Sequence, residues 1–264
     1  MKKTIQMLVI LLLNISILYS AEPTNIDNEK LIRYAMQERY LMQKIVKDYM
    51  YKSNGIAVTK AHNDMLEAFK EFDKKQMILN GFINDVKIKN LLLFIHSNRE
   101  DIANTMKKPY STDNAQEIID MAEVISEGEQ SIISRLTKKL KSKHFLPENQ
   151  RYLTMQVAKY YIVYASGIKD KNTISAMNSV VNKLGKLIEE MKNDQDNTPK
   201  MNQIMDKIDR DWKIISKFYL DIKEGDLPLI VYDTTSKLDE QFYRYNQEHL
   251  MEKNKLLAKI EELK

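Results

Sequence analysis

The chain of 264 residues contains no cysteine, few glycines and prolines, and no block of charge of one sign. Without cysteine it has no disulfide, no thiolate metal site and no cysteine nucleophile. Only six glycines and five prolines occur, so long segments run without a helix-breaking residue. Lysine and glutamate are interspersed, and no concentrated basic face is visible, which argues against nucleic-acid binding. The fold must therefore be stabilised by its apolar core.

The N-terminus has the features of a secretory signal peptide over residues 1–20. Two lysines precede an apolar run from Met7 to Leu18, and the small residues Ser20 and Ala21 follow it. A run of about 13 residues is short for a membrane-spanning helix, which needs roughly 20. We expect cleavage and a soluble periplasmic or otherwise extracytoplasmic protein. Retention of the run as an anchor is the alternative.

Most of the remaining chain is predicted to be helical. Apolar residues recur at spacings of three and four, and only Leu229–Tyr232 resembles a short strand. The predicted helices are 28–53, 57–80, 82–107, 112–143, 148–166, 171–193, 199–223 and 233–263. Short connections between four helices favour an up-down-up-down bundle. The predicted fold is therefore all-α, with two tandem four-helix bundles over 28–143 and 147–263.

Helix ends are marked by particular residues. Gly55 and Gly167 follow the first predicted helix of each bundle, where a left-handed C-cap is expected. Asp113 and Asp233 lie near the start of each fourth helix, at N-cap positions.

A short signature occurs twice in the chain. The residues of its first occurrence return 112 positions later without a gap (151 − 39 = 112). The identical pairs are Arg39 and Arg151, Tyr40 and Tyr152, Leu41 and Leu153, Lys47 and Lys159, Tyr49 and Tyr161, Gly55 and Gly167, Ile56 and Ile168, and Met65 and Met177. An ungapped recurrence of this kind predicts two copies of one structural unit.

The signature places an arginine in an otherwise mostly apolar helix face. Arg39 and Gln43 are the polar members of a stripe that runs from Ile32 to Met50 at spacings of three and four. A buried guanidinium needs partners, and its planar fork of donors suits carboxylates and small oxyanions. Arg39 therefore forms either an internal ion pair with a bundle carboxylate or part of a ligand site.

The stretch Glu38 to Lys47 resembles the R-M-L-S-Q-R-[IM]-A-K box of the PilJ-type domain, found at the N-terminus of type IV pilus chemotaxis transducers. That domain is related to the sensor domain of NarX/NarQ-type nitrate and nitrite receptors. Tyr40 and Met42 depart from the pattern, and the second box, from Arg151 to Lys159, is more degenerate.

The resemblance implies a four-helix extracytoplasmic sensor module. In the nitrate-sensing relatives, one box arginine from each of two subunits reaches a small anion at their interface. Carried over, that role falls on Arg39 and Arg151, and Gln43 adds a neutral donor one turn from Arg39. If the two first helices pack with pseudo-twofold symmetry, both arginines could hold one anion within a single chain. The chain has no kinase or methyl-accepting region, so signalling would need a partner.

No pattern of catalytic or metal-binding residues is visible. The four histidines are dispersed, and none forms H-E-x-x-H or a pair of E-x-x-H motifs, which a di-iron bundle requires. No phosphate-binding or dinucleotide-binding glycine loop occurs. We therefore predict no catalytic residue, no metal ligand and no cofactor.

Two functions remain from different classes. The first is an exported sensory protein, involved in signal transduction such as chemotaxis, that binds a small anion and acts through a membrane receptor or envelope protein. The second is a structural or adaptor protein of the cell envelope without a small-molecule ligand. The sequence leaves the oligomeric state and the ligand open.

Overall fold

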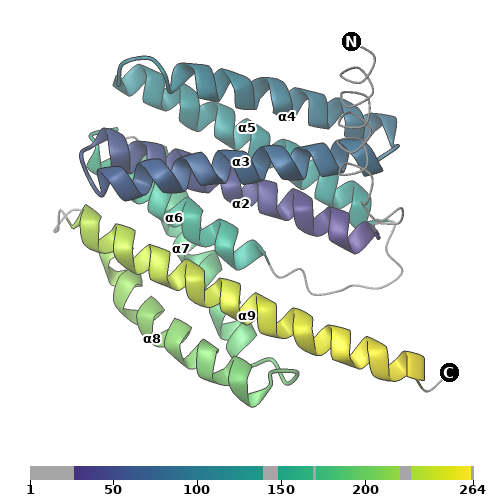
Figure 1. Ribbon diagram of the computed structural model, residues 1–264. Coiled ribbons are helices and arrows are strands. Elements are labelled where there is room, and N and C mark those ends of the chain that lie inside the picture. Colours follow the sequence, from purple (N-terminus) through teal and green to yellow (C-terminus); the bar gives the residue numbers. More distant parts are fainter. Residues whose placement is uncertain (1–26, 139–147, 169–170, 221–226, 263–264) are drawn as a thin grey trace, which may run out of the picture.

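The computed structural model describes residues 27–138, 148–168, 171–220 and 227–262, and these residues form eight helices and no strand (Figure 1). The predicted signal peptide and the predicted end of the fourth helix at 143 lie outside the described residues. The helices are α2 (Asn28–Ser53), α3 (Val58–Phe82), α4 (Val86–Thr105), α5 (Thr112–Thr137), α6 (Asn149–Ala165), α7 (Lys171–Lys192), α8 (Pro199–Leu220) and α9 (Pro228–Glu262). The all-α prediction is confirmed for the described part of the chain.

Helix α4 begins at Val86, four residues after the predicted start at 82 (86 − 82 = 4), and the predicted caps of α5 and α9 also differ from the structure. The side chain of Ser111, and not that of Asp113, caps α5 by accepting a hydrogen bond from the Asn114 amide. Helix α9 begins at Pro228, so Asp233 lies inside the helix and the strand-like run Leu229–Tyr232 is helical. The N-cap predictions for both aspartates are wrong. Proline is favoured in the first turn of a helix because its φ angle suits the helix and its missing N–H would be unpaired there.

The predicted glycine C-caps are confirmed, and both have the same hydrogen bonds. Gly55 and Gly167 have φ angles of 76° and 94°. After α2, the Gly55 amide donates to the Lys52 carbonyl and the Ile56 amide donates to the Tyr51 carbonyl. The equivalent bonds after α6 join Gly167 to Tyr164 and Ile168 to Val163. Each glycine therefore ends its helix in a Schellman motif, in which a left-handed residue is required.

The helices pack in two rings that meet mainly at α2 and α6. Helices α2, α3, α4 and α5 each contact the next, and α5 returns to α2. We call these helices the first helix set. Helices α6 to α9 form the second helix set in the same way, and α2 packs against α6. Figure 1 shows the second helix set beside α2, with α9 as its longest helix. These contacts are compatible with helical bundles.

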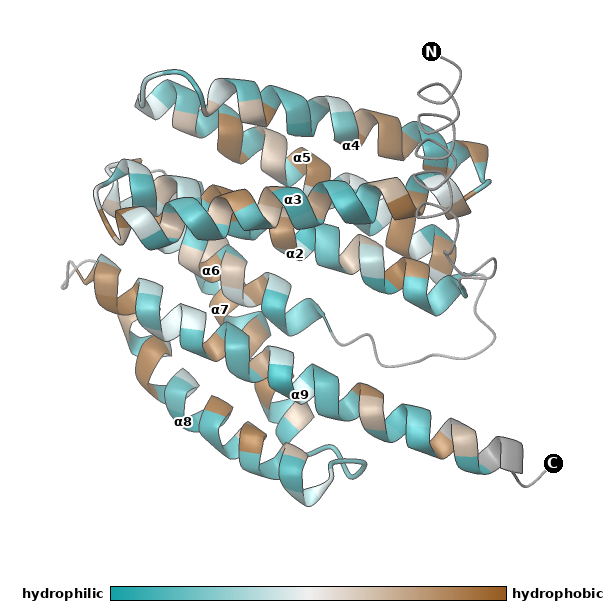
Figure 2. Ribbon diagram, in the orientation of Figure 1, coloured by the Kyte–Doolittle hydropathy of each residue, from teal (hydrophilic) through white to brown (hydrophobic). Residues whose placement is uncertain are grey.

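Helices α2 and α6 are buried on almost all sides. Each contacts three other helices, so their apolar residues extend well beyond the single stripe that the sequence indicates. In the outer helices the apolar residues lie mainly on the inward faces (Figure 2). No helix within the described ranges is long and apolar enough to cross a membrane. The contact between α2 and α6 is therefore enclosed by helices of both sets.

Candidate functional site

The two signature arginines lie at the contact between α2 and α6. The guanidinium carbon of Arg39 is 3.8 Å from the ring centroid of Tyr152, and that of Arg151 is 4.1 Å from the ring centroid of Tyr40. Each arginine thus stacks on the tyrosine that follows the other arginine in the chain. Reciprocal contacts of this kind are typical of an isologous, twofold-related interface.

Arg151 is held by carboxylates. Its Nε and Nη2 donate to the two carboxylate oxygens of Asp239 at 2.8 and 3.0 Å, and Glu148 lies 3.5 Å from Nη1. The Tyr40 hydroxyl accepts from Arg151 and donates to Asp239. Burial alone would lower the pKa of Arg151, but the neighbouring Asp239 carboxylate raises it above its ordinary value. Arg151 therefore forms an internal ion pair, which was the alternative to a ligand site for a buried arginine of the signature.

Arg39 has a different set of partners. Its Nη1 donates to the neutral side chain of Gln130 at 2.8 Å, and its Nε is buried without a hydrogen-bond partner in the described chain. Its guanidinium forms no ion pair with any described carboxylate. Arg39 therefore has an unused N–H donor and no carboxylate partner, whereas the guanidinium of Arg151 is paired with Asp239.

Gln43 is fully buried at the contact between α2 and α5. Its Nε2 donates to the Ser126 hydroxyl at 2.7 Å, and its Oε1 has no partner among the described residues. It lines neither of the two cavities described below. The structure thus places Arg39 and Arg151 in different cavities and Gln43 in the core between helices.

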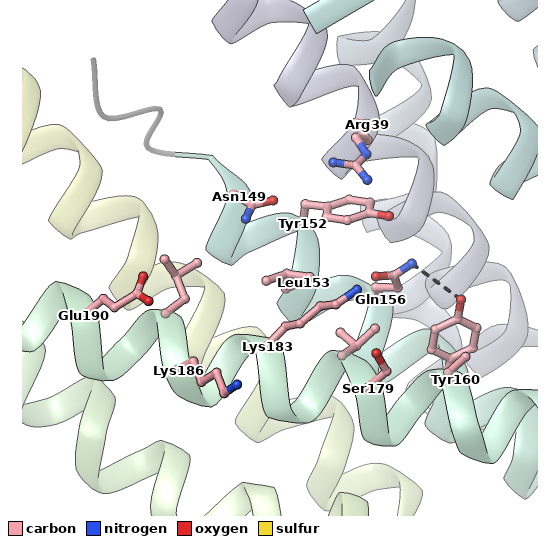
Figure 3. A pocket seen from close by; sticks show the side chains of 13 residues that line it. Arg39, Asn149, Tyr152, Leu153, Gln156, Tyr160, Ser179, Lys183, Lys186 and Glu190 are labelled. Atoms are coloured by element: carbon pink, nitrogen blue, oxygen red, sulfur yellow. Dashed lines mark hydrogen bonds between the residues drawn. The ribbon is translucent and has the colours of Figure 1, made fainter. Parts of the chain in front are cut away.

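Arg39 lines a cavity of about 570 Å³, which we call the Arg39 groove (Figure 3). It lies where α2, α6 and α7 meet. The remaining lining residues are Asn149, Tyr152, Leu153, Gln156, Tyr160, Ala176, Ser179, Val180, Lys183, Lys186, Leu187 and Glu190. The groove therefore combines an apolar floor with several hydrogen-bonding side chains.

Positive charge dominates the Arg39 groove. Arg39, Lys183 and Lys186 are opposed by Glu190 alone, and neither lysine forms an ion pair within the described ranges. Figure 3 shows Lys183 extending across the groove toward Gln156, with the Arg39 guanidinium above the Tyr152 ring. Burial raises the pKa of the Tyr152 hydroxyl, which therefore stays neutral and can donate. This arrangement suits an anionic ligand.

A second cavity, of about 500 Å³, lies beside Arg151, and we call it the Arg151 cavity. Nine of its lining residues stand 112 positions before a lining residue of the Arg39 groove (149 − 37 = 112). They are Gln37, Tyr40, Leu41, Lys44, Asp64, Glu67, Ala68, Glu71 and Lys75, which match Asn149, Tyr152, Leu153, Gln156, Ala176, Ser179, Val180, Lys183 and Leu187. The two arginines exchange places, as twofold symmetry requires.

The cations of the Arg151 cavity are each paired with a carboxylate. Lys44 lies 3.5 Å from Asp64, Lys75 lies 2.8 Å from Glu71, and Arg151 is bound to Asp239. At the position of the cation Lys183, this cavity has the anion Glu71. Two cavities with the same construction therefore differ in charge, and only the Arg39 groove keeps an excess of unpaired cations.

The contribution of α7 to the groove was not predicted, and neither Lys183 nor Lys186 was among the predicted ligand-binding residues. A signal was available, because Lys74 and Lys186 also stand 112 apart (186 − 74 = 112), so the repeat continues beyond Met65 and Met177. This match lies on α7, which lines the Arg39 groove beside α6.

Within the described residues, no group of histidine and acidic side chains could hold a metal ion. No family model, no curated protein and no solved structure matches this chain.

Proposed function

We propose that this protein binds a small organic anion in the Arg39 groove and is a sensory or ligand-binding protein, not an enzyme. One observation carries the proposal. Arg39 and Arg151 occupy equivalent positions, yet only Arg39 lacks a carboxylate partner and faces a cavity with further unpaired cations. Leaving the N–H donors of a half-buried guanidinium without a direct carboxylate partner is costly unless a ligand supplies one.

The dimensions of the groove indicate the class of ligand. Its volume of about 570 Å³ lies within the range of small-molecule sites and is large for an inorganic anion alone. Leu153, Val180 and Leu187 provide apolar surface beside the cations. We therefore propose a molecule with a carboxylate, sulfonate or phosphate group and an apolar part. This departs from the nitrate specificity of the receptors that the signature resembles.

We further propose that the two helix sets are tandem, PilJ-like, up-down-up-down modules over 28–143 and 147–263. The repeated Schellman motifs, the reciprocal arginine stacking and the matched cavities support this division. The groove takes Arg39 from the first module and α6 and α7 from the second. A bound anion would therefore favour one arrangement of the modules, which a membrane receptor or envelope protein could read.

A structural or adaptor role is the second candidate. The network of Arg151, Asp239 and Tyr40 supports it, because this network ties α2 of the first helix set to α6 and α9 of the second without any ligand. The two candidates are separated by whether the groove binds an anion.

Replacing Arg39 with alanine is expected to weaken anion binding by about 10-fold to 100-fold, since one charge-assisted hydrogen bond contributes about 1.5–3 kcal/mol. A thermal-shift screen of the mature protein with aromatic carboxylates, sulfonates and phosphates measures this. Ligand at 100 times its dissociation constant adds about 2.7 kcal/mol to the free energy of unfolding of the wild-type protein.

Lys186→Gln and Lys74→Gln form a matched pair for the same screen. Both lysines are exposed, and they occupy equivalent positions, but only Lys186 lines the Arg39 groove. The Lys186 variant should bind the anion more weakly, and the Lys74 variant should not change. Equal binding by the wild-type protein and the Arg39 variant would favour the adaptor role.

We also propose export with removal of residues 1–20. Sequencing the N-terminus of the protein isolated from its native envelope should find Ala21 or Glu22 as the first residue. An intact Met1 in the membrane fraction would instead indicate an anchored protein.

A further inference from the structure

Two acidic side chains next to the groove face each other in the core. Glu38 of α2 and Glu129 of α5 are both fully buried, and no described N–H or O–H group donates to either carboxyl group. Glu38 directly precedes Arg39 in the chain, and Glu129 directly precedes Gln130. Arg39 and Gln130 are joined by a hydrogen bond. Two facing carboxylates repel, so the pair must hold at least one proton.

The charges around this pair are few. Burial and the neighbouring Glu129 raise the pKa of Glu38 well above its ordinary value. Burial also raises the pKa of Glu129 to about 7, while Glu38 and the positive charge of Arg39 act to lower it. From α3, Lys75 and Asp73 act on Glu38, and Asp73 is itself paired with Arg99 of α4.

The second helix set shows that packing does not require carboxyl groups here. The position of Glu38 corresponds to Gln150 (150 − 38 = 112), which is also buried. The Nε2 of Gln150 donates to Asn246 of α9 at 2.5 Å. A neutral amide pair therefore takes this place between α6 and α9, and the ionisable pair is particular to the helix set that carries Arg39.

We propose that the Arg39 groove binds its anion together with one proton, which the Glu38–Glu129 pair takes from solvent. This inference rests on the proposed function. An anion on the Arg39 guanidinium cancels the positive charge that favours the ionised form of Glu129, so the pair gains a proton. Binding is reciprocal: a protonated pair leaves Arg39 without a nearby internal anion and strengthens its attraction for the ligand.

Isothermal titration calorimetry of the mature chain with p-toluenesulfonate tests the proposal, because the charge of a sulfonate is constant over the pH range used. Titrations at pH 6, 7 and 8, in two buffers that differ in ionisation enthalpy, measure both affinity and proton uptake. We expect proton uptake of up to one per anion near pH 7. The affinity should fall about fivefold or more from pH 6 to pH 8.

Variants locate the proton. Glu129→Gln should abolish proton uptake and the pH dependence of the affinity. The double variant Glu38→Gln and Glu129→Asn, which reproduces the amide pair of the second helix set, should do the same. Glu127→Gln, at an exposed position of α5, should keep the behaviour of the wild-type protein.

The outcomes separate the two proposals. No binding of the sulfonate, or binding that Arg39→Ala leaves unchanged, would argue against an anion groove at Arg39. Binding that depends on Arg39 but takes up no proton, or that takes up the same proton in Glu129→Gln, would overturn proton coupling alone. If the glutamate variants do not fold, the two-buffer titrations of the wild-type protein still decide, because absence of uptake near pH 7 overturns the coupling.

Discussion

Replacing Arg151 with alanine is expected to lower the free energy of unfolding by about 3–5 kcal/mol, as is usual when one partner of a buried ion pair is removed. The substitution would leave Asp239, whose side chain is 14% exposed, and Glu148, at 5%, without the arginine that pairs with both. It would also leave the Tyr40 hydroxyl without its donor from Arg151. Burial and the neighbouring Asp239 raise the pKa of Tyr40, so its hydroxyl stays protonated and keeps donating to Asp239.

Arg39→Ala is the matched control for this measurement. The two arginines stand 112 residues apart and stack on equivalent tyrosines, so both variants lose one cation–π contact. Arg39, however, is hydrogen-bonded to a neutral amide, and its loss is expected to cost only about 1–2 kcal/mol. Urea unfolding of both variants at pH 7 compares them. Equal losses of stability would mean that the carboxylates around Arg151 are hydrated in the native protein and that its network is not a structural tie.

The second large effect is on the pH dependence of stability. Glu129 ionises near 4.5 in the unfolded chain, whereas burial raises its pKa to about 7 in the native protein. The unfolded state therefore loses its proton first as the pH rises. The stabilising contribution of Glu129 is complete below about pH 4.5 and is lost as the pH rises through about 7. At about 1.4 kcal/mol for each pKa unit, the loss between pH 5 and pH 8 is about 2–3 kcal/mol.

The variant with Glu38→Gln and Glu129→Asn should not show this loss. An amide has no proton to lose in this range, and Gln150, at the position of Glu38 in the second helix set, already pairs with the amide Asn246. The difference in the free energy of unfolding between the variant and the wild-type protein should therefore move in favour of the variant by about 2–3 kcal/mol from pH 5 to pH 8. Urea unfolding at both pH values measures it, with Glu127→Gln as the control. A constant difference would show that the pair is solvated or otherwise neutralised.

Local interactions explain which features could be predicted from the sequence. Gly55 and Gly167 have the positive φ angles expected of them, because a Schellman motif depends only on the last turn of the helix and the next two residues. Apolar spacing predicts helices for the same reason, since the helical repeat is a property of a few neighbouring residues. The predicted start of α9 is five residues late (233 − 228 = 5), because it relies on Asp233 as an N-cap. The helix begins instead at Pro228, and proline is favoured at the first helical position.

The tertiary structure alone determines which partners the two arginines bind. Both were predicted to be ligand-binding residues from one repeated signature, of which the second copy is the more degenerate. The difference comes from Gln130 and Asp239, which are 91 and 88 residues away from their arginines. They stand 109 residues apart (239 − 130 = 109), so the offset of 112 that relates the arginines does not relate their partners. The spacing of a helix determines which of its faces is apolar. Which residue of a distant helix meets that face depends on the rotation and register of both helices, and these are set by the packing of the whole core.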